Sequence, residues 1–337
     1  MTEMTVLNGT AIEELLTIPM AVEAVEQAYL EKSKGDAALW PMVFHEFDPG
    51  HADLDIKSGD LSGLGVYGLK VVSWFGANSD KGLPALYGTS LLFDLATGAP
   101  RALLNAGPIT DFRTGAAGAI GAKYLARPDA ETLLMAGTGA LAPYLIAATL
   151  YLLPQIKTVY VANPHHPVQS ASACESIISQ VEKLLFSCGG CHAAITAAPD
   201  LEEAVRHSGV ILTATPSREP FLKAEWVQPG THISCVGADM PGKQEVEGAL
   251  FPVAKVFGDD TAQCLSVGEC EMPYKAGTFS GEICEIGSVI SGAAPGRTGD
   301  DDVTIFDSTG IALQDIAAAA ALLRAAQKAG KGQMVTL

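Results

Sequence analysis

The sequence predicts an α/β protein of two domains, one of them a parallel sheet covered by helices on both faces. From Glu131 onward, short and fully apolar segments alternate with helical segments, as parallel strands buried on both faces do. Between about residues 40 and 104, short β-like runs are instead separated by Gly, Pro, Asn and Asp, which favours strands joined by turns. The chain has 337 residues and is 48% hydrophobic, so it is long enough to bury two cores.

The N-terminal part is predicted to mix helix and strand. Apolar side chains at helical spacing predict one helix over residues 11–34. Strands are expected at 66–74, 89–94 and 102–105. An Ala- and Gly-rich segment at 114–126, which Pro128 ends, predicts a closely packed helix.

The segments after Glu131 predict the parallel sheet and its helices. Strands are expected at 132–136, 158–162, 193–196, 209–214, 232–236, 255–257 and 303–307, and helices at 141–152, 169–186 and 201–207. An Ala-rich helix over about 313–328 follows, and a helix in this place often returns to pack on the first domain. The expected domains are therefore a discontinuous α+β domain, 1–116 with 309–337, and a parallel-sheet domain, 117–308.

The turn Gly137-Thr138-Gly139-Ala140 follows the first strand of the expected parallel sheet and precedes a helix. The first crossover of a Rossmann unit needs one glycine for the tight turn and a second that lets backbone amides approach a pyrophosphate at the helix N-terminus. Gly137 and Gly139 take these positions, and Ala142 takes the close-packing position. The parallel-sheet domain is therefore predicted to be a Rossmann domain that binds NAD or NADP.

The end of the second strand normally chooses between these two cofactors. An Asp or Glu there accepts a hydrogen bond from the ribose 2′-hydroxyl of NAD, whereas a nearby cation accommodates the 2′-phosphate of NADP. This sequence has Asn163, followed by a proline and two histidines, with neither a carboxylate nor an arginine. Asn163 can serve either ribose, so the choice between NAD and NADP stays open.

Charge and cysteine content exclude several classes of function. Lys and Arg number 21 against 38 Asp and Glu, and the net charge of -17 makes nucleic acid and anionic membranes poor partners. The first residues lack the regions of a signal peptide, and the apolar stretch 141–153 is too short to span a bilayer. Seven irregularly spaced cysteines favour reduced thiols in a cytoplasmic protein, and the segment 188–192, CGGCH, is interpreted as a turn rather than a metal site.

Two basic residues, Lys70 and Arg113, stand in segments where a charged side chain is unusual. Lys70 stands inside an apolar strand, and Arg113 follows the segment 109–112, ITDF. Buried cations are costly unless they are paired, so these residues predict an anion site between the domains. For Lys70 taken alone, a place on the solvated face of an edge strand is the alternative.

Four segments resemble the ornithine cyclodeaminase/mu-crystallin family. They are residues 69–130, which begin LKVVSWFGANSDKG, and the segments LLMAGTGALA, PGTHISCVGADMPGKQEVE and VTIFDSTGIALQDIAAA. Together they run in family order from about Lys57 to the end of the chain. The family includes cyclodeaminases, ketimine and cyclic imine reductases, alanine dehydrogenase-like enzymes and a thyroid-hormone-binding crystallin. The resemblance implies a Rossmann domain plus a substrate domain, made from the N-terminal part and the last helix, that also forms a homodimer.

The resemblance also implies roles for individual residues. Lys70 and Arg113 match the family's carboxylate-binding pair, with Lys70 placed to assist proton transfer, and Asp239 matches its catalytic carboxylate. Cofactor contacts are expected from Arg113, Thr114, Gly137, Thr138, Gly139, Ala140, Asn163, Lys243 and Ser308. These residue types suit the chemistry, because a guanidinium orients a carboxylate and protonation of an imine nitrogen assists hydride delivery.

The chain departs from the family's cyclodeaminases before Lys70. The arginine of those enzymes is missing from the segment 40–46, WPMVFHE, in which His45 is expected to contact the substrate. Lys57 stands on a strand that faces the substrate in relatives, where it would repel the second ammonium of ornithine. It favours a substrate with an extra carboxylate, such as iminosuccinate, whose reduction gives aspartate. Alternatively, Lys57 replaces the missing arginine on the α-carboxylate, which leaves pyruvate-imine and cyclic imine substrates open.

The preferred hypothesis is NAD(P)H-dependent reduction of a small imino acid to an amino acid, with an iminosuccinate reductase or an alanine dehydrogenase-like reaction in first place. The alternative is an ornithine or lysine cyclodeaminase, an ammonia lyase that recycles bound NAD. A non-catalytic, crystallin-like binder ranks last, because Lys70, Arg113 and Asp239 are all present.

Overall fold

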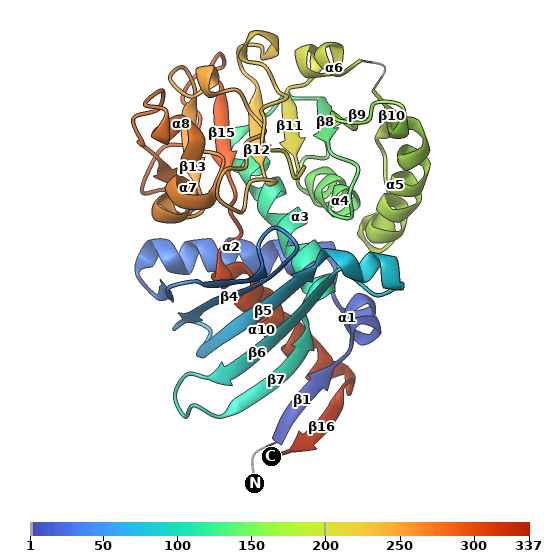
Figure 1. The fold of residues 1–337 in the computed structure, drawn as a ribbon, viewed down its shortest axis with the longest axis vertical. Helices are drawn as coiled ribbons and strands as arrows, with labels where there is room; N and C mark the ends of the chain where they lie inside the picture. Colours follow the sequence, from blue (N-terminus) through green and yellow to red (C-terminus); the bar gives the residue numbers. More distant parts are fainter. Residues whose placement is uncertain (1–2, 199) are drawn as a thin grey trace. The chain divides into compact units, whose positions relative to one another are not determined.

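The computed structural model describes residues 3–198 and 200–337, which form two compact units (Figure 1). The first unit consists of the chain up to Arg113 together with Ile311–Leu337, and the second of Thr114–Gly310. These boundaries lie a few residues from those expected from the sequence. The chain passes from the first unit to the second inside helix α3 (Ala106–Leu125).

The first unit is built on an eight-stranded mixed sheet. Its strands are, in spatial order, β16 (Gln333–Thr336), β1 (Glu3–Leu7), β7 (Pro100–Asn105), β6 (Leu86–Asp94), β5 (Val66–Phe75), β4 (Ala52–Leu61) and β2 (Ala37–Leu39), with β3 (Val43–Asp48) also paired to β4. β1 and β7 are parallel, and the other neighbouring pairs are antiparallel. The three strands expected from the sequence in this part are present, each a little longer or shifted at its start.

Helix α10 (Ala312–Ala329) packs against β4, β5, β6 and helix α2 (Ile18–Lys34) of the same unit (Figure 1). A strand glycine permits the close approach, because a Cβ on Gly59 would lie 3.1 Å from Leu313 Cδ2 and 2.5 Å from the Ala38 carbonyl oxygen. The Ala-rich C-terminal helix therefore belongs to the first unit, and it covers the sheet face to which Gly59 points.

The single helix expected over residues 11–34 is wrong, because the chain forms α1 (Gly9–Leu15) and α2 there. Thr17 begins α2 by accepting the Met20 N–H on Oγ1 at 3.4 Å. Pro19, in the first turn of α2, has no N–H with which to continue α1. The apolar periodicity runs through both helices and hides the break.

Helix α3 begins at Ala106 rather than near residue 114. The Asn105 side chain accepts the Gly107 N–H at 2.9 Å, and Pro108 lies in the first turn, which are two ordinary signals of a helix start. Within the second unit, the helix packs as closely as its composition predicts, since a Cβ on Gly118 would lie 2.6 Å from Leu145 Cδ2.

The second unit is built on one parallel sheet of eight strands. In spatial order these are β10 (Ala194–Ala197), β9 (Thr158–Ala162), β8 (Thr132–Ala136), β11 (Val210–Thr213), β12 (His232–Cys235), β15 (Thr304–Asp307), β13 (Lys255–Gly258) and β14 (Cys284–Glu285). The helices are α4 (Ala142–Leu152), α5 (Gln169–Leu185), α6 (Leu201–His207), α7 (Thr261–Val267), α8 (Glu271–Lys275) and α9 (Ile286–Ile290). The order, outward from β8 in both directions, is that of a Rossmann fold, so the fold class is confirmed. The short strand β14 and the short helices α7, α8 and α9 were not expected from the sequence.

The middle of this sheet is buried and holds a histidine. His232 is fully buried, and its two ring nitrogens lie 2.9 Å from Thr304 Oγ1 and from Ser234 Oγ. Burial lowers the pKa of His232 to about 3, so the ring is neutral in the folded protein. Among the described helices, none combines the length and apolar character needed to cross a membrane.

Candidate active site

The glycine turn between β8 and α4 is tight on one side and open on the other. Gly137 has a φ of 134°, and a Cβ there would lie 2.4 Å from the Ala214 carbonyl oxygen, so the position requires glycine. A Cβ on Gly139 would meet nothing within 4 Å. Ala142, the first residue of α4, is buried. A pyrophosphate can therefore approach the amides at the start of α4 on the open side.

Asn163, just after β9, is held against this turn. Its Nδ2 donates to Thr138 Oγ1 at 2.9 Å, and its Oδ1 accepts the N–H groups of His165 and His166 at 3.2 and 2.9 Å. The structure therefore brings together two residues that the sequence assigns to the cofactor. Both the oxygen and the nitrogen of the Asn163 amide are hydrogen-bonded to protein atoms, which orients the amide. The amide is uncharged, so it does not offer the ribose a carboxylate.

Two hydroxyl groups expected to contact the cofactor are unpaired within the described part of the chain. Thr114 Oγ1 and Ser308 Oγ are both buried, and neither has a hydrogen-bond partner there. Buried polar groups are normally satisfied, so these hydroxyls suit a bound ligand with polar oxygens. Asp307 precedes Ser308 and accepts the Cys270 N–H at 3.0 Å, and burial raises the pKa of Asp307 to about 7.

In the first unit, Lys70 and Arg113 meet around a carboxylate that the sequence reasoning missed. Lys70 Nζ lies 3.0 Å from each carboxylate oxygen of Asp315, and Arg113 Nε lies 3.2 Å from Asp315 Oδ1. Arg113 Nη1 also donates to Gln314 Oε1 at 2.9 Å, and Gln314 Nε2 donates to the Tyr29 hydroxyl at 2.8 Å. All five side chains are buried. We refer to Lys70, Arg113 and Asp315 as the buried charge cluster.

The charges of this cluster shift one another. Burial lowers the pKa of Lys70 to about 8; the Asp315 carboxylate opposes that effect, and the charges of Arg113 and Lys57 add to it. Burial alone would raise the pKa of Asp315, but Arg113 and Lys70 hold it below its usual value. Asp315 is therefore ionised at neutral pH, and Lys70 loses its proton at a pH just above neutral.

Lys57 extends the cluster across the sheet. It stands directly opposite Lys70 in the β4–β5 ladder, and Lys70 stands directly opposite Ser90 in the β5–β6 ladder. Directly opposed residues share a face, with Cβ atoms about 4.5–5.5 Å apart. Ser90 is buried, and its Oγ has no hydrogen-bond partner among the described residues. Lys57, Lys70 and Ser90 therefore form a row on the sheet face that α10 covers.

The structure does not bring His45 into this row. His45 pairs with Leu54 in the β3–β4 ladder, which is three residues before Lys57 on β4. Side chains alternate along a strand, so His45 projects from the opposite face. It is exposed and makes an edge contact with Phe47, with ring centroids 5.0 Å apart. Its expected place beside Lys57 and Lys70 is therefore not supported.

Asp239 and Lys243 lie together in the loop that follows β12. Lys243 Nζ donates to Asp239 Oδ1 at 2.6 Å, and the Asp239 side chain is 50% exposed. Ligands of open parallel sheets bind beyond the carboxyl ends of the strands, which is where this loop begins. The structure thus leaves an accessible carboxylate at that edge, paired to the lysine expected near the nicotinamide.

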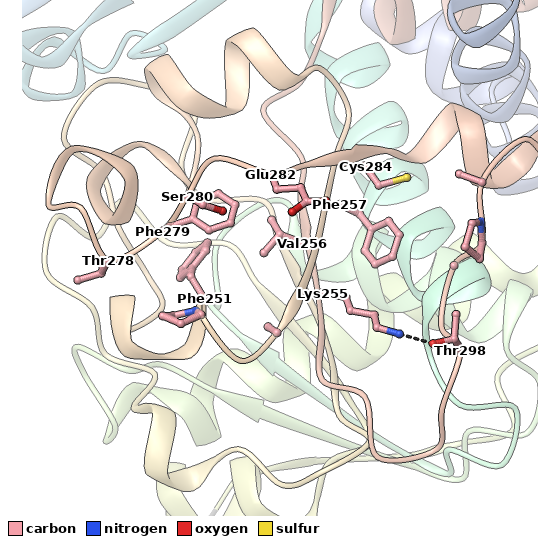
Figure 2. Close-up of a pocket in the computed structure, with 15 residues that line it drawn as sticks. Phe251, Lys255, Val256, Phe257, Thr278, Phe279, Ser280, Glu282, Cys284 and Thr298 are labelled. Carbon is pink, nitrogen blue, oxygen red and sulfur yellow. Dashed lines mark hydrogen bonds between the residues drawn. The ribbon is translucent and has the colours of Figure 1, made fainter.

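The second unit also has a cavity of about 660 Å³ beside β13 and β14 (Figure 2). Phe251, Phe257 and Phe279 contribute apolar walls, and Lys255 is hydrogen-bonded to Thr298 there. None of the residues assigned from the sequence to substrate or cofactor lines this cavity. It is therefore separate from the candidate active site.

The cysteine-rich turn shows no feature of a metal site. Cys188 and Cys191 are free and partly exposed, and the two glycines between them have φ of 100° and 86°. Within residues 3–198 and 200–337, no group of three or more His, Cys, Asp or Glu side chains is arranged to hold a metal ion.

Comparison with known proteins identifies the family. Residues 2–330 match the ornithine cyclodeaminase/mu-crystallin family. The alanine dehydrogenase of Archaeoglobus fulgidus is 36% identical over 321 residues, which cover 94% of this chain and 93% of that protein. The iminosuccinate reductase of Paracoccus denitrificans is 33% identical over 336 residues, which cover 99% and 100%.

Solved structures agree with the fold over nearly the whole chain. An archaeal alanine dehydrogenase dimer with bound NAD has a TM-score of 0.87 at 34% identity, covering 99% of each chain. The iminosuccinate reductase of Paracoccus denitrificans in complex with NAD+ has a TM-score of 0.89 at 32% identity, covering 99% and 100%. A lysine cyclodeaminase that recognises L-lysine, L-ornithine and L-2,4-diamino butyric acid has a TM-score of 0.83 at 28% identity, covering 99% and 96%.

Proposed function

The chain belongs to the ornithine cyclodeaminase/mu-crystallin family, and we propose that within it the protein is a nicotinamide-dependent reductase that converts an imino acid into an amino acid. Iminosuccinate is the first candidate substrate, and aspartate is the product. The observation that carries this choice is the placement of Lys57 directly opposite Lys70 of the buried charge cluster. Alanine dehydrogenase and iminosuccinate reductase among the relatives support the reaction class.

The first unit supplies the groups that bind the substrate. Arg113 and Lys70 hold the α-carboxylate, and Asp315 fixes both cations in position before the substrate arrives. Lys57, in the same row, binds the second carboxylate of a four-carbon imino acid. Ornithine offers an ammonium at that end, which Lys57 repels.

The second unit supplies the proton. A bound NADH would supply the hydride that the imine carbon takes up. The carbon–nitrogen π bond opens toward nitrogen, and Asp239 in its acid form gives a proton there, so that the amino acid and NAD+ result. Lys243 Nζ donates to Asp239 Oδ1 and so orients the carboxyl group, whose other oxygen carries the proton for this transfer.

The residues present fit a dinucleotide. Gly137 and Gly139 leave the turn open, and the unpaired hydroxyls of Thr114 and Ser308 can donate to its oxygens. Two similar enzyme structures were determined with NAD bound, so we expect NADH to be used in preference to NADPH. Asn163 carries no charge that rejects a 2′-phosphate, and NADPH is therefore expected to support a slower reaction.

The reaction is tested by following NADH oxidation with oxaloacetate plus ammonium, and with pyruvate plus ammonium or methylamine. Turnover with the first pair is expected to be the faster, and no turnover with any pair would refute the reductase. Lys57→Ala should raise KM for the oxaloacetate mixture at least about tenfold more than KM for the pyruvate mixture. Lys157→Ala, at an exposed pair with Glu131, is the control. Equal losses with both substrates would place Lys57 on the α-carboxylate instead.

A cyclodeaminase is the second candidate, because the lysine cyclodeaminase structure is similar over the whole chain. It requires ammonia release from ornithine or lysine with no net change in nicotinamide absorbance. A crystallin-like binder would show neither reaction, although Lys70, Arg113 and Asp239 are retained.

We further propose a cytoplasmic homodimer formed through the first unit. Large apolar side chains are exposed on its strands and the connecting segments: Trp40, Met42, Val43, Phe44, Phe47, Phe75, Leu83, Leu86 and Tyr87. One similar structure is a dimer, and all seven cysteines are free thiols. Sedimentation should show a dimer that Phe47→Glu dissociates, while Phe186→Glu, exposed in the second unit, does not. A monomeric wild-type protein would refute this assembly.

A further inference from the structure

Glu245 is a fully buried carboxylate that lies at the centre of the second unit's hydrogen bonds. Its Oε1 accepts the Thr215 N–H and the Thr215 hydroxyl, both at 2.7 Å. Its Oε2 accepts the Thr213 hydroxyl at 2.6 Å and the Gly237 N–H at 3.0 Å. Four donors converge on two oxygens, which is the environment of an ionised carboxylate.

These four bonds join two loops at the carboxyl edge of the parallel sheet. Thr213 ends β11, whereas Gly237 lies two residues after the end of β12, in the loop that carries Asp239. The contact leaves no room at Gly237, where a Cβ would lie 2.4 Å from the Thr215 carbonyl oxygen and 2.5 Å from Glu245 Cδ. The backbone of the loop therefore contacts the Glu245 carboxylate at Gly237, two residues before Asp239.

The other end of this loop is tied by a second acid. Glu271, which is fully buried at the start of α8, accepts the Gly242 N–H at 2.7 Å. Asp239 is thus held between two fixed backbone positions, Gly237 and Gly242, while its own side chain stays half exposed. The arrangement fixes the backbone of the loop and leaves the carboxyl group accessible.

A third buried acid, Glu269, is hydrogen-bonded to the backbone at Glu245. Glu269 Oε1 accepts the backbone N–H groups of Glu245 and Val246 at 2.8 and 2.6 Å. Burial, together with the Glu245 charge, raises the pKa of Glu269 well above its usual value. Burial also raises the pKa of Glu245, but its four hydrogen bonds oppose this effect. Four donors point at Glu245 and only two at Glu269, so the hydrogen bonds favour the charge on Glu245.

We propose that Glu245 is a positioning residue of the reductase, which sets the place of Asp239 by anchoring the Gly237 amide to the end of β11. The proposal rests on the proposed function, because Asp239 is the proton donor of that reaction. The four hydrogen bonds also explain how Glu245 can be charged although none of these four donors is a cation. Four oriented N–H and O–H dipoles take the place of a counterion.

The test compares Glu245→Gln with Glu247→Gln in the full-length enzyme, using NADH with oxaloacetate and ammonium. Glu247 is the matched control, because its side chain also accepts a backbone N–H, from Ala224 at 2.8 Å, outside the loop. Glu245→Gln places an amide NH2 group against donors and should lower kcat about 100-fold. KM and the Kd for NADH should change less than about threefold, since neither ligand is bound by Glu245. An equal kcat loss in Glu247→Gln, or a loss confined to KM, would overturn the proposal.

Two further measurements separate this proposal from the proposed function. Asp239→Asn should lower kcat about 100-fold, and adding Glu245→Gln should lower it less than about threefold more, because both changes remove the same proton transfer. Multiplicative losses would overturn the role of Glu245 while leaving Asp239 as donor. Full activity of Asp239→Asn would refute the donor itself, and this proposal with it.

Hydrogen–deuterium exchange needs no substrate and keeps the positioning claim testable whatever the activity. Glu245→Gln should raise exchange at least about tenfold in residues 236–243 and leave residues 132–141 unchanged. A milder variant, Thr213→Val, keeps the Glu245 charge and should show the same pattern at smaller size. Unchanged exchange in both variants would overturn the anchoring role.

Discussion

Removing the carboxylate of the buried charge cluster should destabilise the first unit strongly. Asp315→Asn keeps the size of the side chain but leaves Lys70 and Arg113 without their shared counterion. Breaking a buried ion pair costs about 3–5 kcal/mol, because the remaining charge stays desolvated. Part of this cost is relieved if Lys70 loses its proton, and its pKa, already about 8, falls further once Asp315 is gone. We therefore expect the lower end of the range, about 3 kcal/mol, and a Tm lower by about 10 °C.

The assay is thermal unfolding at pH 7, with Glu131→Gln as the control. Glu131 pairs with Lys157 at 2.5 Å, but their side chains are 55% and 69% exposed, so this change should leave Tm within about 2 °C. Succinate should raise the Tm of Asp315→Asn more than that of the wild type, because a bound carboxylate replaces the missing charge. A Tm of Asp315→Asn equal to that of the wild type would refute the reasoning, since the cations would then need no counterion.

Three further predictions follow from other residues. Lys70 must be protonated to bind a carboxylate and its pKa is about 8. The Ki of succinate, which is a dianion at neutral pH, should therefore be constant between about pH 7 and 8 and rise above pH 8; a flat profile to pH 10 would remove Lys70 from the binding site. Asn163→Asp supplies the missing carboxylate after β9 and should raise the kcat/KM ratio of NADH to NADPH about tenfold or more; an unchanged ratio would mean that Asn163 does not face the ribose. His232 has a folded-state pKa of about 3 against an ordinary value of 6.5, so the unfolded chain binds more protons between these values and stability falls as the pH drops. The fall should reach about 2–3 kcal/mol between pH 6.5 and 4.5 beyond that of His232→Gln, and parallel Tm profiles of the two proteins would contradict it.

The second unit could be predicted largely from the sequence because its signals are local. Each buried parallel strand is a short apolar run, and the Gly137 turn lies between one strand and one helix. β14 escaped because it has only two residues. The break between α1 and α2 was not predicted because the apolar side chains keep a helical spacing across it. Thr17 and Pro19, which are ordinary signals of a helix start, were the evidence against a single helix.

The buried charge cluster could be predicted only in part, because its partners are distant in the chain. Asp315 lies 245 residues from Lys70. It stands in an Ala-rich helix, whose sequence predicts only that the helix is buried. One signal was available: Asp315 is the only acid between residues 311 and 326, and a carboxylate buried in a mostly apolar helix requires a partner. The face on which His45 lies needs the exact strand register, since a shift of one residue moves every side chain to the other face.

The return of α10 to the first unit has a consequence for how the protein is made. A ribosome completes the sheet strands of residues 37–105 long before it synthesises Asp315 and the apolar face of α10. At about 5–20 residues per second, this gap lasts on the order of 10–40 s. During that interval Leu61 and Leu92 do not yet have α10 to cover them, while the second unit, which is continuous in the chain, is synthesised without interruption. The half of the enzyme that is translated first is therefore expected to mature last, and it is the half whose nascent chain most needs chaperone protection.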